Sequence, residues 1–113
     1  VQDDGAQIRC FAHVKGVIAA VLKLMQTDAA VGEVINIGSN TPITILELAH
    51  KVIEVCDSKS QVEFQTYTDA YDESFEDIRR RVPDLTKLCN LIGDPNHCGI
   101  EQIIANVRDE FNR

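Results

Sequence analysis

The chain has 113 residues, which suits one domain, and its 44% content of apolar residues argues against global disorder. Acidic residues outnumber lysine and arginine by 18 to 11, so the net charge of −7 disfavours binding to a nucleic-acid backbone. No apolar run approaches the roughly 20 residues that cross a bilayer, which excludes a simple membrane span.

The start of the chain and its cysteines bear on where the protein works. No signal-peptide pattern opens the sequence, and the first residue is Val1 rather than methionine. We therefore expect a cytoplasmic protein that is processed or is a piece of a longer one. The four cysteines, at positions 10, 56, 89 and 98, form no CxxC pair, which favours reduced thiols and predicts no bound metal.

The first third of the chain predicts two strands and a helix. Residues 8–14 alternate as in a strand, and the spacing of apolar residues then becomes helical over Val14–Met25. Residues 34–37 form a continuous apolar run between glycines, as expected for a strand that is covered on both faces. These elements predict a parallel or mixed sheet.

The middle of the chain contains its most secure predicted element. Thr44 and Glu47 form a capping-box pattern, and a clean apolar stripe follows over residues 45–56. Val62 and Phe64 then alternate with polar residues, which predicts a short strand. We expect an α/β fold in which helices pack on a small mixed sheet.

Residues 66–83 predict neither helix nor strand. Loops longer than about 12–15 residues are uncommon in compact domains and are often functional, so this loop is a candidate lid over a ligand. Asp84 can cap a helix over residues 85–92, which Gly93 and Pro95 end. A last helix over residues 100–111 begins near Gly99.

Two stretches carry the chemistry that the sequence offers. Residues 32–40 run from an apolar strand into a Gly-Ser-Asn turn, and residues 79–84 place three arginines beside a proline and before a helix. Both suit an anionic ligand. Neither contains a nucleophile or an acid/base pair, and the three histidines have no recognisable catalytic partner. We therefore predict no catalytic residue here and interpret the chain as the ligand-binding part of an enzyme.

The order of the motifs resembles one family. In chain order they are Gly5-Ala-Gln-Ile-Arg-Cys-Phe11, a helix, Gly32-Glu-Val-Ile-Asn-Ile-Gly38, a capped helix and Arg80-Arg-Val-Pro-Asp84. This order is similar to that of the nucleotide-sugar epimerases, dehydratases and decarboxylases among the extended short-chain dehydrogenase/reductases. The likeness covers nearly the whole chain but only the C-terminal third or so of a typical member. It implies that residues 1–113 are the C-terminal substrate-binding domain, with the Rossmann domain absent from this chain.

The resemblance also implies roles for three residues. Arg9 matches an arginine that reaches the substrate diphosphate, and Arg81 and Asp84 match a pair that holds the diphosphate and the ribose. A guanidinium fork binds phosphate oxygens in pairs, which agrees with these roles. Gly16 stands where the family usually has aspartate.

The resemblance implies an NAD-dependent enzyme only when the protein is complete. The chain contains neither a GxGxxG fingerprint nor Tyr-x-x-x-Lys, so we expect it to bind no NAD alone and to lack the redox chemistry. The expected partners are a UDP- or dTDP-sugar, the missing Rossmann domain and, at full length, a second copy in a homodimer.

Other interpretations remain open from the sequence. Arginines 79–81 also suit a solvated basic run that neutralises the acidic stretch before it, and a plain strand-ending turn explains residues 38–40. The alternative function is a stand-alone nucleotide-binding or partner-docking module without catalysis.

Overall fold

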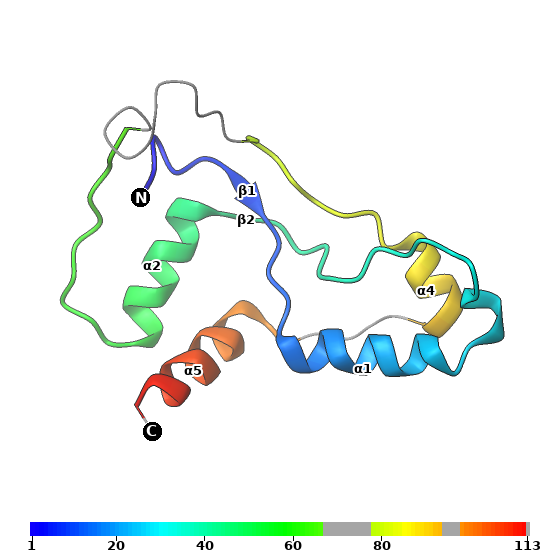
Figure 1. Ribbon diagram of the computed structural model, residues 1–113. Helices are drawn as coiled ribbons and strands as arrows, with labels where there is room; N and C mark the ends of the chain where they lie inside the picture. The colour runs from blue at the N-terminus through cyan, green and yellow to red at the C-terminus, as the bar shows by residue number, and fades with distance from the viewer. Residues whose placement is uncertain (67–77, 94–97, 113) are drawn as a thin grey trace.

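The computed structural model describes residues 1–66, 78–93 and 98–112 (Figure 1). The predicted acidic stretch at residues 69–77, most of the candidate lid, Pro95 and His97 lie outside these ranges. In chain order the elements are β1 (Ile8–Arg9), α1 (Val14–Met25), a short 3-10 turn (Asp28–Ala30), β2 (Ile43–Thr44), α2 (Ile45–Val55), α4 (Thr86–Ile92) and α5 (Ile100–Phe111).

The sheet is small and its pairing is mixed, as predicted. Strands β1 and β2 are antiparallel, with Ile8 opposite Thr44 and Arg9 opposite Ile43. On its other side Ile8 forms a parallel bridge with Arg80. The predicted strand over residues 8–14 is shortened to two residues, because the next partner in this register is Pro42, which has no N–H to donate.

Two predicted strands do not form in the described part of the chain. Residues 34–37 carry no strand, and the Val34 side chain is 87% exposed. The run around Val62 and Phe64 forms only one parallel bridge, between Gln65 and Gln2. A strand needs a neighbouring backbone to satisfy its N–H and C=O groups, and no backbone–backbone hydrogen bond joins residues 34–37 to other described residues. The α/β class is confirmed, but with less sheet than expected.

The helices begin where local capping chemistry predicts. Helix α1 has the predicted bounds, and its N-cap His13 accepts a hydrogen bond from the Lys15 amide. At α2 the Thr44 hydroxyl accepts from the Glu47 amide at 3.1 Å, and the Glu47 carboxylate accepts from the Thr44 amide at 3.1 Å. The capping box predicted for this helix is therefore confirmed.

The last two helices also agree with the prediction, apart from one residue at the start of α4. This helix begins at Thr86 rather than at Leu85. Its N-cap is Leu85, which forms no side-chain capping hydrogen bond, and not Asp84 as predicted; Asp84, one residue earlier, accepts from the Thr86 amide at 2.9 Å. Gly93 ends α4 with φ of +81°, a conformation that glycine adopts without strain. Helix α5 starts after Gly99, as expected.

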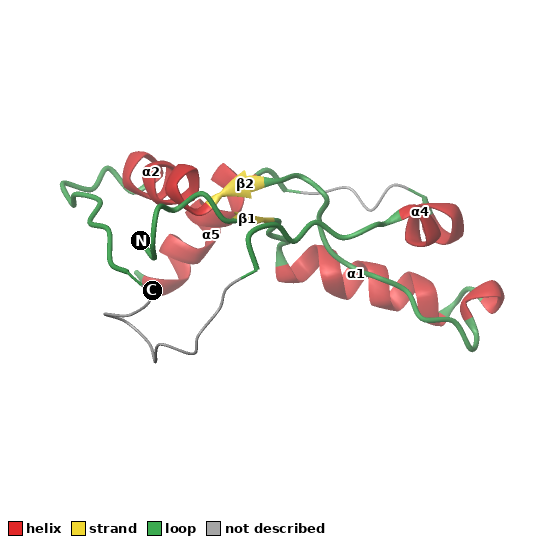
Figure 2. Ribbon diagram, turned by 90° about the horizontal axis from the view of Figure 1, so that it is seen from above, coloured by secondary structure: helices red, strands yellow, loops and turns green. Residues whose placement is uncertain are grey.

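The helices gather into two pairs joined by extended chain. Helix α2 packs on α5, and α1 packs on α4 at the other end of the molecule, as Figures 1 and 2 show from two directions. The buried side chains Ala20, Leu85 and Leu88 belong to the α1–α4 pair, while Ile104 belongs to the other pair. The β1–β2 ladder and the segment before α4 run between the pairs.

A large apolar surface stays open to solvent. One face of α1 exposes five apolar side chains by 40% or more: Val14, Ile18, Val21, Leu22 and Met25. The radius of gyration is 16.9 Å, against about 13 Å for a compact domain of this length. An exposed apolar surface of this kind is typical of an interface with another domain or protein. No described helix is long and apolar enough to cross a membrane, and all four cysteines are free.

Candidate functional site

Arg9 and Arg81, which are predicted from the sequence to bind the ligand, line the same pocket. This cavity has a volume of about 500 Å³, and Asn36, Gly38 and Ser39 form part of its wall. We call it the arginine pocket. Its volume falls within the range of about 300–1,000 Å³ that is usual for small-molecule sites.

The backbone of β1 brings the two arginines together. The Ile8 carbonyl accepts a hydrogen bond from the Arg81 amide at 3.0 Å, and the Ile8 amide donates to the Arg79 carbonyl at 2.7 Å. The Arg9 guanidinium donates to the same Ile8 carbonyl at 2.8 Å. The segment before α4 therefore lies along β1, as Figure 1 shows, and carries Arg81 to the position of Arg9.

The lining of the arginine pocket favours an anion. Its described lining residues include two arginines and no acidic residue, although the whole chain carries a net charge of −7. Arg9 is half-buried and Arg81 is exposed, so the pocket combines a partly buried cation with an exposed one. A fixed guanidinium with little competing negative charge suits phosphate or carboxylate oxygens.

The pocket has no activated nucleophile. Burial raises the pKa of the Cys10 thiol, and the positive charge of nearby Arg80 only partly offsets that effect. The thiol therefore stays protonated at neutral pH. The described residues of the lining include no histidine or carboxylate that could act as a general base. The arginine pocket can bind an anion, but it offers no acid/base chemistry.

Asp84, the third predicted site residue, lies outside the arginine pocket. It lines a neighbouring depression with Asn36, Thr86 and Lys87. One of its carboxylate oxygens accepts from both the amide and the hydroxyl of Thr86, at 2.9 and 2.6 Å. These hydrogen bonds lower the pKa of Asp84, so it is ionised at neutral pH. In this structure its carboxylate binds the first residue of α4.

Asn36, which is not among the three site residues predicted from the sequence, connects the two depressions. It lines both of them, and its side-chain amide donates to the Asp84 carbonyl at 3.2 Å. Ser39 is buried in the wall of the arginine pocket, where its hydroxyl accepts from the Thr41 amide at 3.2 Å. The Gly-Ser-Asn turn after the apolar run was the available signal, but a plain turn explained it equally well.

Curated proteins similar to this chain act on nucleotide sugars. The chain is 36% identical over 88 residues to UDP-N-acetyl-alpha-D-glucosaminuronate decarboxylase of Bacillus cytotoxicus, a match that covers 78% of this chain and 27% of that protein. It is 34% identical over 93 residues to UDP-glucuronic acid decarboxylase 4 of Arabidopsis thaliana, which covers 82% and 19%. The chain thus spans about a fifth to a quarter of these relatives. No family model matches it.

Solved structures agree on the fold. UDP-glucose 4-epimerase of Thermotoga maritima, solved with UDP-glucose, superposes with a TM-score of 0.84 at 21% identity, covering 99% of this chain and 34% of the epimerase. In its fold, this chain thus resembles about a third of the epimerase. A dTDP-glucose 4,6-dehydratase of Bacillus anthracis, solved with NAD, gives 0.81 at 23% identity, with 99% and 33% covered. The resemblance that the motifs predicted is therefore confirmed.

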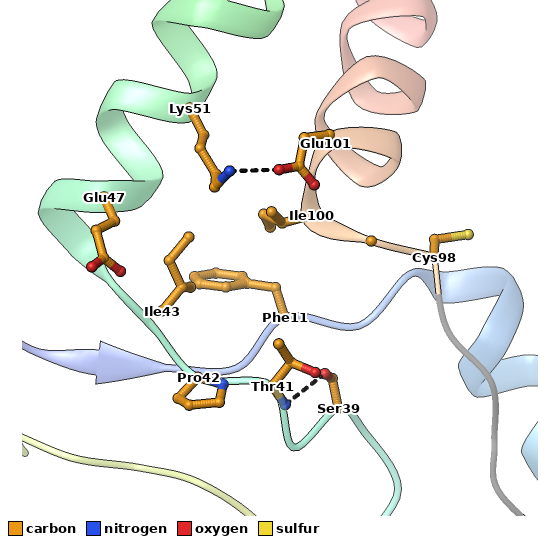
Figure 3. Close-up of a pocket in the computed structure, with 11 residues that line it drawn as sticks. Phe11, Ser39, Thr41, Pro42, Ile43, Glu47, Lys51, Cys98, Ile100 and Glu101 are labelled. Atoms are coloured by element: carbon orange, nitrogen blue, oxygen red, sulfur yellow. Dashed lines mark hydrogen bonds and ion pairs between the residues drawn. The ribbon is translucent and has the colours of Figure 1, made fainter.

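A second cavity of this chain lies between α2 and α5 (Figure 3). Its volume is about 510 Å³, and Phe11 and Ile43 are among its apolar wall residues. Lys51 and Glu101 point toward one another across it and form an ion pair. Glu47 also lines it, so its carboxylates outnumber its cation and it suits a phosphate less well than the arginine pocket does.

The other arginines of the 79–81 run lie elsewhere. Arg79 pairs with Asp3 and Asp4 near the N-terminus, and neither Arg79 nor Arg80 lines the arginine pocket. Among the described residues no group of three histidine, cysteine or acidic side chains is placed to hold a metal ion.

Proposed function

We propose that this chain is the sugar-nucleotide-binding part of a decarboxylase or epimerase that acts on UDP- or dTDP-sugars. The observation that supports this most directly is that Arg9 and Arg81 line one pocket, whose described lining residues include no carboxylate. The two residues are 72 positions apart in the chain, and hydrogen bonds to the same Ile8 carbonyl bring them together. The curated relatives act on UDP-linked sugar acids, as their names state.

In this proposal the arginine pocket holds the diphosphate. The two guanidinium groups bind phosphate oxygens and stay charged at every physiological pH. Asn36 and Asp84 extend the site into the neighbouring depression, where the ribose lies. Thr86 uses one Asp84 oxygen, and the lone pairs of the other can accept from ribose hydroxyl groups.

The reaction itself takes place outside this chain. A bound NAD would oxidise and reduce the sugar, and the residues that hold it and carry the catalytic groups would belong to an N-terminal Rossmann domain. The present chain contributes binding energy at the diphosphate, remote from the reacting carbon, which orients the sugar. The exposed apolar face of α1 would pack against that missing domain. A cytoplasmic location and a homodimer belong to the same proposal.

The test is UDP binding to the complete protein, measured by calorimetry. We expect Arg81→Ala to weaken UDP binding, and to raise the KM for the sugar nucleotide, by roughly tenfold or more. Lys59→Ala is the control, since Lys59 is an exposed cation that lines none of the cavities described above. Unchanged affinity in Arg81→Ala, or an equal loss in the control, would remove Arg81 from the site.

A second comparison separates the proposal from a stand-alone module. The isolated 113-residue chain should bind UDP much more weakly than the complete protein, because half of the proposed site is missing from it. Equal affinity in both would favour a nucleotide-binding module without catalysis.

A further inference from the structure

Arg79 forms a contact that joins the segment before α4 to the N-terminal turn of the chain. Its Nη2 atom lies 3.1 and 3.0 Å from the two carboxylate oxygens of Asp4, and Nη1 lies 3.6 Å from the Asp3 carboxylate. We call this contact the Arg79 clasp. All three side chains are about half exposed, and exposed ion pairs contribute little to global stability. Stability alone therefore gives a poor reason for the clasp.

The acidic side of the clasp is a rigid turn. Asp4 also accepts from the Ala6 amide at 2.9 Å, which closes an Asx turn. Asp3 and Gly5 adopt φ values of +52° and +70°, and the Gly5 carbonyl accepts from the Leu46 amide of α2 at 2.9 Å. The Asp4 carboxylate is thus held by its own turn and, through Gly5, by α2. An ion pair to such a fixed carboxylate can hold the segment that carries Arg79 in place.

Both partners of the clasp are close in sequence to the arginines of the pocket. Asp4 comes five residues before Arg9, and Arg79 comes two residues before Arg81. Two backbone hydrogen bonds join β1 to the segment before α4. The Ile8 amide donates to the Arg79 carbonyl, and the Arg81 amide donates to the Ile8 carbonyl. The clasp adds a side-chain restraint at the end of this short pairing.

We propose that Arg79 is a positioning residue, whose clasp with Asp4 sets the separation of Arg9 and Arg81 for the diphosphate. This inference rests on the proposed function. The clasp also places two carboxylates around Arg79, so this third cation is neutralised beside the arginine pocket and does not draw the ligand away. Small errors in the placement of binding groups reduce affinity steeply, so a contact of little value for stability can matter for binding.

The experiment measures the binding of UDP, and of uridine as a ligand without phosphate, to the complete protein. The variants are Arg79→Gln, Asp4→Asn, the double variant and Arg79→Lys. Asp4→Asn keeps a side-chain oxygen for the Ala6 amide, so it removes the charge and spares the turn. Lys51→Gln is the matched control, because it breaks an exposed ion pair in the other half of the molecule.

We expect Arg79→Gln and Asp4→Asn each to weaken UDP binding about three- to tenfold, with the double variant no weaker than either single variant. Uridine binding should stay unchanged, because uridine has no diphosphate to place. Arg79→Lys should stay within about twofold of wild type, since one nitrogen of Arg79 contacts both Asp4 oxygens and an ammonium group can replace it. Lys51→Gln should bind UDP as wild type does.

Three results would overturn the inference. Wild-type UDP affinity in Arg79→Gln, alongside a loss in Arg81→Ala, would leave the proposed function intact and remove the clasp from it. Losses that add in the double variant, or persist in Arg79→Lys, would mean that Arg79 contacts the ligand directly. A complete protein that does not bind UDP, or that binds it unchanged in Arg81→Ala, would refute the proposed function and the clasp with it.

Discussion

Arg9 and Arg81 meet at one atom, the carbonyl oxygen of Ile8. Arg9 donates to it from its side chain at 2.8 Å and Arg81 from its backbone amide at 3.0 Å. The first bond anchors one guanidinium, and the second anchors the backbone from which the other guanidinium extends. A shared acceptor therefore couples the positions of two cations that are 72 residues apart in the chain. The predictions below test this coupling and its surroundings.

The preference for a second phosphate should depend on both arginines. We expect Arg9→Gln and Arg81→Gln each to reduce the ratio of UDP to UMP affinity by roughly tenfold or more, because a charge-assisted hydrogen bond contributes about 1.5–3 kcal/mol. Arg81→Lys, which keeps the charge but loses the fork, should give an intermediate ratio. Calorimetry on the complete protein measures both affinities. A ratio that stays at the wild-type value would place the diphosphate elsewhere.

Gly5 should not tolerate a side chain. Its φ is +70°, and a methyl group there would lie 2.8 Å from the Val1 side chain and 2.9 Å from Cβ of Leu46. We expect Gly5→Ala to lower the free energy of unfolding by at least about 1 kcal/mol. Gly16→Ala is the opposite case, since an added methyl meets nothing within 4 Å and α1 gains a better helix former, worth about 0.5–1 kcal/mol. Thermal unfolding distinguishes the two variants, and similar melting temperatures would contradict this account.

The exposed face of α1 should matter only in the complete protein. Ile18 and Leu22 are 53% and 55% exposed here, so replacing both with serine should change the stability of the isolated chain little. In the complete protein, where we propose that this face is buried, each loss should cost about 2 kcal/mol or more. Lys23→Ser, on the same helix, is the control. Equally small effects in both forms would mean that no other domain covers α1.

Acid should weaken the fold through exposed carboxylates. Hydrogen bonds from Arg79 lower the pKa of Asp4, and hydrogen bonds from Thr86 lower that of Asp84, both from an ordinary value of 3.8. A lowered pKa in the folded state means that the contribution to stability is present above pH 3.8 and is lost as the pH falls through the folded-state value. Asp84→Asn should therefore flatten the decline of stability below about pH 4. Denaturant unfolding at several pH values measures it, and parallel curves for wild type and variant would contradict it.

Helix α2 shows which parts of the fold the sequence could predict. Its capping box and apolar stripe lie within one short stretch, so the information for the helix is local. The strand predictions failed because pairing depends on distant residues. Strand β1 stops where Pro42 comes opposite, and residues 34–37 form no backbone–backbone hydrogen bond with the described part of the chain.

The candidate site divides in the same way. The sequence alone determined its chemistry, because guanidinium groups near a proline and a helix start suit an anion whatever their surroundings, and the order of motifs indicated the family. Only the tertiary structure decided which residues share a pocket. In the structure, Arg9 and Arg81 line one pocket and Asp84 lines the neighbouring depression. Arg79 forms an ion pair with Asp4. Residue type sets what a side chain can bind, whereas the register between segments more than 70 residues apart sets which side chains act together.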